Sequence, residues 1–277
     1  ALTCFEGVNR ILPGDFVRIP ANGSSAECII KRSLNYMRMI QTPGSLYDII
    51  DKSVKDRMEN KLDGISVLLS AGWDSNIILH HLLKHTGDIE IVSYVSAESE
   101  DVENIARRYG LPIKWVSPKP DQLGSAVWAY ESPLDYGSLL PNYLLFKHCS
   151  NSIVYTGDGA DELFSGYNRA REKDTFYYDV FTELPYYHNV RLDRMAMIHT
   201  KEARSPLMSN PLLAYSLQTP WRDRVGKSQL KEIYRNLLPP EVTRDKEKTP
   251  LRTNLSKDVN MKTCFFTFNK IYNEPIE

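Results

Sequence analysis

Short apolar segments that alternate with helical patterns constrain the fold of this chain more than any other feature of its sequence. Four of them have strand length: 65–69, 89–95, 113–117 and 152–157. Helical patterns begin near Ser45 and fill the intervals near 76–86, 101–109 and 139–149. This alternation predicts parallel βαβ units with right-handed crossovers, so we expect an α/β fold. Beyond residue 170 strand patterns vanish, which predicts a helical C-terminal part.

The first residues form a separate pattern. Segments 8–12 and 16–20 have the composition of two short strands joined by a Pro-Gly turn. A hairpin of this size is marginal by itself. We therefore divide the chain into a β-hairpin at 1–24 and one large domain at 25–277.

Composition and charge exclude several classes of function. The 277 residues carry 34 Lys and Arg against 35 Asp and Glu, a formal net charge of −1 that gives no reason to expect nucleic acid as a partner. The sequence has no apolar run of membrane-spanning length and no recognisable signal peptide. The four cysteines are scattered, which is typical of reduced thiols. We therefore expect a cytoplasmic protein that acts on small molecules.

The stretch SAGWDS, residues 70–75, lies between the first apolar strand and its helix. Parallel sheets bind ligands at the carboxyl ends of their strands, where a helix N-terminus favours an anion. Gly72 lets phosphates approach the main chain and can adopt conformations that other residues resist. Asp74 suits a Mg²⁺ ion that bridges carboxylate to phosphate. The alternative is an ordinary turn with Asp74 or Ser75 as the helix N-cap.

A second polar turn, TGDGADELFSGY at 156–167, follows another predicted strand. It places Asp158 between two glycines, and Asp161 and Glu162 at the start of the next helix. Helix capping alone also selects acidic residues at such a position. Three carboxylates beside the first turn need a neutralising positive charge, and Mg²⁺ bound to a triphosphate supplies it.

Both turns resemble motifs of one family. SAGWDS resembles the S-G-G-x-D-S loop of ATP pyrophosphatases, and TGDGADELFSGY resembles a segment of the synthetase domain of glutamine-dependent asparagine synthetases. Two later segments are similar to that domain: RLDRMAMIHTKEARSPLMSNPL at 191–212 and GKSQLKEIYRNLLPPEVTRDKEKTPL at 226–251. The resemblance implies the adenine nucleotide α-hydrolase-like fold of the PP-loop ATP pyrophosphatases.

The resemblance also implies a chemistry and a set of site residues. In that family a substrate carboxylate attacks the α-phosphorus of ATP, and ammonia then displaces AMP from the acyl-adenylate. Nucleotide contacts are implied at Ser70, Ala71, Gly72, Trp73, Asp74, Ser75, Val92, Thr156, Gly157 and Lys227. Asp74 and Asp161 would hold Mg²⁺. Asp158 would assist the amine, and Lys246 would stabilise the transition state.

Several positions admit other roles. Val92 also fits the core, Lys248 is a rival of Lys246, and lysines are ordinarily solvated. Ala71 replaces a family glycine, so its backbone must tolerate a Cβ. The chain starts at Ala1 without a recognisable glutaminase domain, so we expect nitrogen to come from ammonia or from a separate amidotransferase.

Three functions follow from these observations. The first is an ammonia-dependent asparagine synthetase that uses ATP and Mg²⁺ and acts on small molecules. The second is a related ligase or cyclase with another acceptor, such as a former of β-lactam or lasso-peptide rings. The third is a nucleotide-binding remnant without activity. The protein partners to consider are a separate glutaminase and a second copy of the chain.

Overall fold

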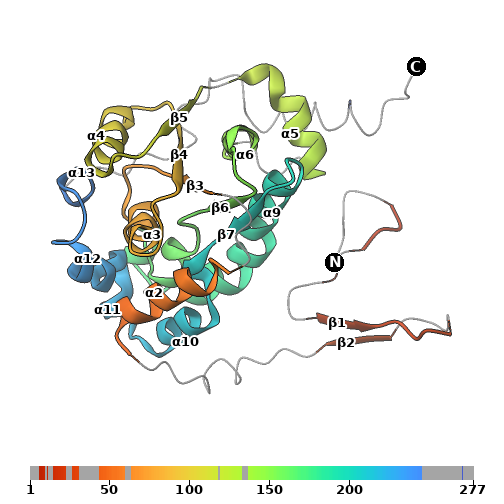
Figure 1. Ribbon diagram of the computed structural model, residues 1–277. Helices are drawn as coiled ribbons and strands as arrows, with labels where there is room; N and C mark the ends of the chain where they lie inside the picture. The colour runs from red at the N-terminus through yellow and green to blue at the C-terminus, as the bar shows by residue number, and fades with distance from the viewer. Residues whose placement is uncertain are drawn as a thin grey trace.

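The centre of the protein is a parallel β-sheet. The computed structural model describes residues 6–9, 11, 15–22, 27–30, 44–59, 64–117, 119–132, 137–244 and 270. Among these residues the sheet has five strands in the order β5-β4-β3-β6-β7, with helices on both faces (Figure 1). The strands are β3 (Ile65–Leu68), β4 (Ile89–Tyr94), β5 (Ile113–Val116), β6 (Ile153–Tyr155) and β7 (Glu202–Arg204). All neighbouring pairs are parallel, which confirms the predicted α/β fold.

Strand β7 was not predicted, so the expectation of no strand beyond residue 170 is wrong. Its three residues, Glu-Ala-Arg, contain no apolar run because β7 lies at an edge of the sheet. Pairing with β6 holds it there. The N–H of Glu202 donates to the carbonyl of Ser152 at 2.8 Å, and the N–H of Thr156 donates to the carbonyl of Arg204 at 3.0 Å.

Six helices cover the two faces of the sheet in the described part of the chain. On one face lie α2 (Leu46–Asp56), α3 (Trp73–Leu83) and α4 (Ser99–Tyr109), and on the other α5 (Leu123–Tyr130), α6 (Leu139–His148) and α9 (Asn189–Met197). Helix α2 begins with a capping box, in which Ser45 and Asp48 each accept a hydrogen bond from the other's main-chain N–H. Helix α4 ends at Gly110, whose φ of +64° suits glycine.

The C-terminal part is helical, as predicted. It contains α7 (Ala160–Leu163), η2 (Asn168–Arg171), α8 (Phe176–Tyr178), the π-helical η3 (Asp179–His188), η4 (Pro206–Met208), α10 (Asn210–Gln218), α11 (Trp221–Arg224), η5 (Val225–Lys227), α12 (Ser228–Tyr234) and α13 (Pro240–Thr243). A 3₁₀ turn, η1 (Pro120–Gln122), precedes α5. Most of these segments are too short to form alone, so their apolar contacts with the core must stabilise them.

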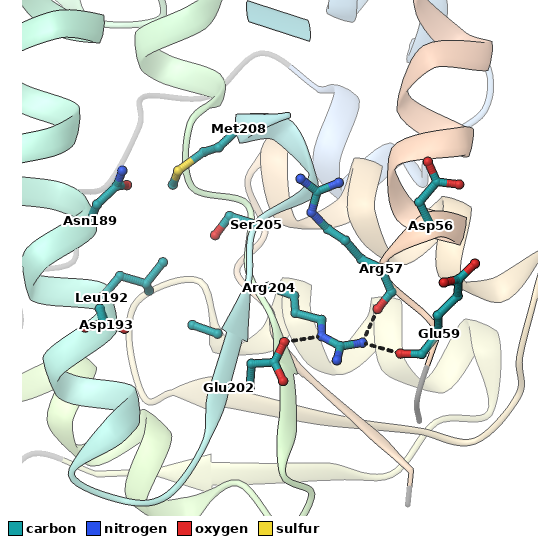
Figure 2. A pocket seen from close by; sticks show the side chains of 11 residues that line it. Asp56, Arg57, Glu59, Asn189, Leu192, Asp193, Glu202, Arg204, Ser205 and Met208 are labelled. Atoms are coloured by element: carbon teal, nitrogen blue, oxygen red, sulfur yellow. Dashed lines mark hydrogen bonds and ion pairs between the residues drawn. The ribbon is translucent and has the colours of Figure 1, made fainter. Parts of the chain in front are cut away.

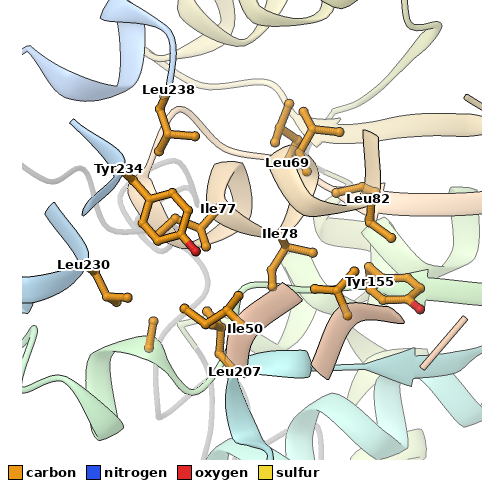
Figure 3. Packing of buried hydrophobic residues seen from close by; sticks show 14 of the residues in the cluster. Ile50, Leu69, Ile77, Ile78, Leu82, Tyr155, Leu207, Leu230, Tyr234 and Leu238 are labelled. Atoms are coloured by element: carbon orange, nitrogen blue, oxygen red, sulfur yellow. The ribbon is translucent and has the colours of Figure 1, made fainter. Parts of the chain in front are cut away.

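The hydrophobic core consists of one cluster on each face of the sheet. Successive strand residues point to opposite faces, so Ile91 joins the cluster under α2, α3 and α4, whereas Val92 joins the cluster under α5, α6 and α9. Figure 3 shows the first cluster, which includes Ile50 of α2, Ile78 of α3 and Tyr155 of β6. Burial of these apolar surfaces fixes helix α3, and hence its first turn, against the end of β3.

The N-terminal region contains a strand pair that the sequence did not predict. Strand β1 (Asp15–Arg18) overlaps the predicted segment 16–20, but its partner is β2 (Glu27–Ile30), in antiparallel register. The pairing predicted for segment 8–12 stays a prediction, because residues 10 and 12 lie outside the described residues. Four residues, Glu-Cys-Ile-Ile, were too short a run to be recognised from the sequence. The division of the chain at residues 24 and 25 stays a prediction.

Two expectations from composition bear on the described residues. None of the helices described there combines the length and the apolar character that crossing a bilayer requires. Cys149 is a free thiol in the core, and burial raises its pKa to about 12. It is therefore protonated at neutral pH.

A partly buried carboxylate, that of Glu90, joins the sheet to the loop before β6 and makes stability depend on pH. Burial by itself raises the pKa of Glu90, but hydrogen bonds from Ser150, Ser66 and Lys114 outweigh it and lower the pKa to about 2. The ordinary value is higher, so the stabilisation is complete above about pH 5 and is lost as the pH falls toward 2. We expect Glu90→Gln to reduce the free energy of unfolding at pH 7 by about 1–3 kcal/mol.

Denaturant unfolding between pH 2.5 and 7 measures this effect. The wild type should lose its advantage over Glu90→Gln in the acid range. Glu103→Gln, on the exposed pair with Arg107 of α4, is the matched control and should change stability little. Equal stability of Glu90→Gln and the wild type at pH 7 would contradict the assignment.

Candidate active site

The first predicted loop lies at the carboxyl end of β3 and opens helix α3. Gly72 is the N-cap, and among the described residues no side chain caps the helix. The alternative in which Asp74 or Ser75 is the N-cap is therefore wrong. The hydroxyl of Ser70 accepts the N–H of Gly72 at 3.1 Å, and the hydroxyl of Ser75 accepts the N–H of Ser70 at 3.2 Å. A helix N-terminus without a side-chain cap, at the carboxyl end of a parallel strand, suits an anion.

Glycine is not needed at position 72 for its backbone angles. Gly72 has φ −84° and ψ 164°, which any residue adopts, so the expectation of an unusual conformation is wrong. Its closeness to phosphate stays a prediction. Ala71 is likewise absent from the described residues with positive φ, and its side chain is fully buried in the core. The backbone at this position therefore tolerates a Cβ.

Two residues that the sequence did not single out hold the loop in shape. The side-chain amide of Asn76 donates to the carbonyls of Ser70 at 2.8 Å and Gly72 at 2.7 Å. The carboxylate of Glu98, beyond the end of β4, accepts the N–H of Ala71 at 3.3 Å. An asparagine one turn into a helix has no distinctive pattern, and Glu98 reaches the loop only because β3 and β4 are neighbours.

The second loop, after β6, packs directly on the first. A Cβ on Gly157 would lie 2.6 Å from the main-chain nitrogen of Ser75 and 2.8 Å from the carbonyl carbon of Asp74. Gly159 has φ +98°, and a Cβ there would lie 2.5 Å from Cγ of Met208. Gly157 therefore lets the second loop approach the first, and Gly159 lets it approach Met208 of η4.

Lys227 joins the two loops electrostatically. Its ammonium group lies 2.6 Å from both carboxylate oxygens of Asp74 and 2.7 Å from Oδ1 of Asp161. The lysine side chain is 8% exposed. Burial lowers the pKa of Lys227, but the two carboxylates outweigh it and raise the pKa above its ordinary value. Lys227 is therefore a fixed positive charge at the centre of the site.

A pair of loops positions Lys227. The lysine is the N-cap of α12, with φ +62°, and its N–H donates to the carbonyl of Phe164 at 3.1 Å. The N–H of Gly226 donates to the carbonyl of Ser165 at 2.9 Å. A Cβ on Gly166 would lie 2.2 Å from both Oδ1 of Asp161 and Cε of Lys227. Gly166 thus leaves the space that the ion pair occupies.

The carboxylates of Asp74 and Asp161 fit the role of Mg²⁺ ligands. Both are oxygen donors, and they converge on one point that already holds a cationic group, the ammonium of Lys227. In the described part of the chain, no group of three or more His, Cys, Asp or Glu is arranged to hold a metal ion by itself. Mg²⁺ usually binds through one or two carboxylates together with phosphate and water, and this pair suits that arrangement.

Asp158 lies beside a buried arginine that the sequence did not predict as part of the site. Its Oδ1 is 3.6 Å from Nη2 of Arg191, and the arginine side chain is 9% exposed. Arg191 also donates to the hydroxyl of Ser138 at 2.7 Å and contacts Nδ1 of His188 at 3.4 Å. The guanidinium group therefore places a positive charge beside Asp158.

Glu162 has a separate role from the other two carboxylates of its loop. Its side chain is buried, accepts the Tyr167 hydroxyl at 2.5 Å and lies 3.3 Å from Nε2 of His188. Burial raises the pKa of Glu162 to about 7. It supports the wall of the site through His188 rather than facing Lys227.

The remaining predicted residues divide into three groups. Thr156 lies in the second loop, where its hydroxyl and that of Ser205 are 2.8 Å apart. The side chain of Val92 is fully buried, which agrees with the core role. Trp73, in the first turn of α3, is half-buried against the core. Lys246 and Lys248 lie outside the described residues.

A polar pocket of about 530 Å³ adjoins the second loop on the side of β7 (Figure 2). Met208, which contacts Gly159, lines it together with Ser205. Arg204 donates to the main-chain carbonyls of Arg57 and Glu59 and pairs with Glu202 of its own strand. The pocket is thus built around an unpredicted strand.

The parallel sheet, together with the loop that leads from β3 into the N-terminus of α3, defines a fold of the PP-loop type. The chain belongs to the asparagine synthase family, because the family's sequence profile matches residues 45–176 and 170–265. The match includes every loop of the site described above.

Individual relatives carry the same family name. Glutamine-hydrolyzing asparagine synthetase 1 of Bacillus subtilis is 30% identical over 150 residues, which cover 44% of this chain and 23% of that protein. The glutamine-hydrolyzing asparagine synthetases of Rattus norvegicus and Bos taurus are 23% identical over 213 and 229 residues, which cover 64% and 70% of this chain. These matches span 37% and 40% of the two mammalian proteins. The chain thus matches less than half the length of these relatives.

Proposed function

We propose that this chain is an AMP-forming amide ligase that uses ATP, and that its substrate is aspartate with ammonia as the nitrogen donor. The observation that carries the proposal is the convergence of Asp74 and Asp161 on the ammonium of Lys227, at the carboxyl ends of β3 and β6. Two carboxylates and a lysine beside an uncapped helix N-terminus suit a magnesium pyrophosphate group. Family membership supports the same chemistry.

The first loop binds the phosphates in this proposal. The N-terminus of α3 and the hydroxyls of Ser70 and Ser75 donate to pyrophosphate oxygens. Lys227 adds a positive charge where the leaving group gains negative charge, which lowers the barrier to adenylation. Asp74 and Asp161 would hold Mg²⁺, and the ion would neutralise negative charge on the phosphates.

The second loop binds aspartate, the substrate that accepts the adenylyl group, in this proposal. A carboxylate of aspartate attacks the α-phosphorus and displaces pyrophosphate, and ammonia then attacks the acyl carbon and displaces AMP. Asp158 accepts a proton from the incoming amine, and Arg191 holds the carboxylate in place for that step. Lys246 stabilises charge on the transition state. We further propose a cytoplasmic location and a supply of nitrogen from free ammonia or a separate glutaminase.

Arg191 offers a test of this second step. We expect Arg191→Met to slow amide formation about tenfold to a hundredfold, because Asp158 loses its orientation. Aspartate-dependent exchange of pyrophosphate into ATP should change little, since it reports adenylation alone. Arg224→Met removes another buried arginine, paired with Asp174 at 3.1 Å, and should leave the ratio of the two rates unchanged. A parallel fall of both rates in Arg191→Met would place Arg191 outside the amine step.

Release of pyrophosphate tests the function as a whole. The purified chain is incubated with Mg-ATP and ammonium chloride, with and without aspartate, and pyrophosphate, AMP and asparagine are measured. Equal amounts of the three products, formed only with aspartate, are expected. Release with a different carboxylate would favour a related ligase or cyclase. ATP binding without release for any carboxylate would favour the nucleotide-binding remnant.

A further inference from the structure

Helices α3 and α12 are linked twice, at both of their ends. At the N-terminal ends, Lys227 pairs with Asp74 at 2.6 Å. Near the C-terminal ends, the hydroxyl of Tyr234 lies 2.6 Å from Nε2 of His81. Figure 3 shows Tyr234 of α12 beside Ile77, which lies on α3 between Asp74 and His81. No part of the proposed mechanism uses the second link.

The two links have the same spacing on both helices. Asp74 and His81 are seven residues apart on α3, and Lys227 and Tyr234 are seven residues apart on α12. Seven residues make about two turns and about 10.5 Å of helix, so each pair lies on one face. The two links therefore join segments of equal length on α3 and α12, so a slide or rotation of α12 that broke one link would disturb the other.

The link at Tyr234 is rigid and directional. His81 and Tyr234 are both fully buried, and Nδ1 of His81 lies 2.8 Å from the carboxylate of Asp51 on α2. Burial lowers the pKa of His81 to about 4, so the ring is neutral at pH 7. A neutral ring whose Nδ1–H donates to Asp51 leaves Nε2 to accept the Tyr234 hydroxyl. Asp51, itself paired with Lys84 at 2.7 Å, thus orients the whole chain of hydrogen bonds.

Lys227 needs such support because its own backbone is strained. Its φ of +62° follows the φ of +66° at Gly226, and α12 has only seven residues. A lysine in this conformation persists only when its surroundings hold it. The contacts with Phe164 and Ser165 hold the N-terminal side of Lys227, and the anchor on the other side is two turns away, at Tyr234.

We propose that Tyr234 is a positioning residue for Lys227: its bond to His81 fixes the register of α12 on α3 and keeps the lysine ammonium between Asp74 and Asp161. This inference rests on the proposed role of Lys227 as a phosphate contact. The geometry of the site then depends on Tyr234, a side chain outside it. A displacement of α12 would therefore move the lysine ammonium relative to the loop at 70–75.

The test compares Tyr234→Phe with Tyr47→Phe. The ring of Tyr47 lies next to that of Tyr234, with a distance of 5.7 Å between the ring centroids. The hydroxyl of Tyr47 lies 3.1 Å from Nε2 of His80. That contact joins α2 to α3 and leaves α12 untouched. Both variants lose one hydroxyl that bonds to a histidine, so they match in chemistry and in location.

The first measurement uses no nucleotide. Lys227 is acylated by acetic anhydride in brief pulses, and mass spectrometry follows its labelling rate. We expect Tyr234→Phe to raise that rate about tenfold, the weight of one lost hydrogen bond, and Tyr47→Phe to leave it unchanged. Equal protection of Lys227 in Tyr234→Phe and the wild type overturns the inference. Should Tyr234→Phe fail to fold, Asp51→Ala, which releases His81 from the other side, provides the same comparison.

The second measurement is the affinity for Mg-ATP by calorimetry. Tyr234→Phe should weaken binding about fivefold to tenfold, and it should have no further effect in the Lys227→Met background, because its influence passes through the lysine. An equal loss in both backgrounds would overturn the inference. Failure of the wild type to bind Mg-ATP would refute the proposed function, while the labelling rates would still decide the role of Tyr234.

Discussion

Replacement of Lys227 by methionine should lower the free energy of unfolding by about 3–5 kcal/mol when no divalent cation is present, because it leaves two partly buried carboxylates without their shared cation. Asp74 and Asp161 each lie within 2.7 Å of the lysine ammonium. Methionine preserves most of the side-chain volume, so the effect reports charge rather than a cavity. Denaturant unfolding at pH 7 with a chelator measures it.

Addition of Mg²⁺ turns this variant into a test of the metal assignment. With the ammonium removed, the two carboxylates should bind Mg²⁺ more tightly, and millimolar Mg²⁺ should restore part of the lost stability. The wild type should respond less, because Lys227 competes for the same oxygens. Lys84→Met, which removes an exposed partner of Asp51, is the control and should show no response. Indifference of Lys227→Met to Mg²⁺ would refute Asp74 and Asp161 as its ligands.

The elements predicted correctly are those whose sequence pattern is local. Strands β3 and β4 have dense apolar runs, and α3 follows its strand at once, so periodicity alone located them. Strand β7 has no such run, since an edge strand is held by its neighbour rather than by its own residues. The partner of β1 was missed for a related reason, because pairing depends on a contact between segments and a single segment does not encode it.

The site shows the same division between local and distant information. The loops at 70–75 and 156–167 were recognisable because each carries its polar residues in one short stretch. The pairing of Lys227 with Asp74 joins residues 153 positions apart, and the contact of Arg191 with Asp158 depends on where α9 packs. The sequence resemblance named Lys227 as a phosphate contact, but the structure brings its ammonium to two carboxylates. Only the fold gives a lysine that position.

Replacement of Gly157 by alanine should separate the two loops and reduce the rate of adenylation by about a hundredfold or more. The added Cβ would lie 2.6 Å from the main-chain nitrogen of Ser75 and 2.8 Å from the carbonyl carbon of Asp74. Both are backbone atoms at the start of α3, and that helix is fixed by the core, so neither can rotate away as a side chain would. A displacement of about 1 Å at a reacting centre is enough for a loss of this size.

The structure supplies a matched control for this substitution. Gly124, within α5, has open space around its Cβ position, so Gly124→Ala should stabilise the protein by about 0.5–1 kcal/mol through helix propensity alone. Thermal unfolding and pyrophosphate exchange are measured for both variants. Gly157→Ala should lower the melting temperature as well as the exchange rate, since the second loop can move only by breaking its contacts with Ser75 and Met208. A normal exchange rate in Gly157→Ala would mean that adenylation does not need the close approach of the two loops.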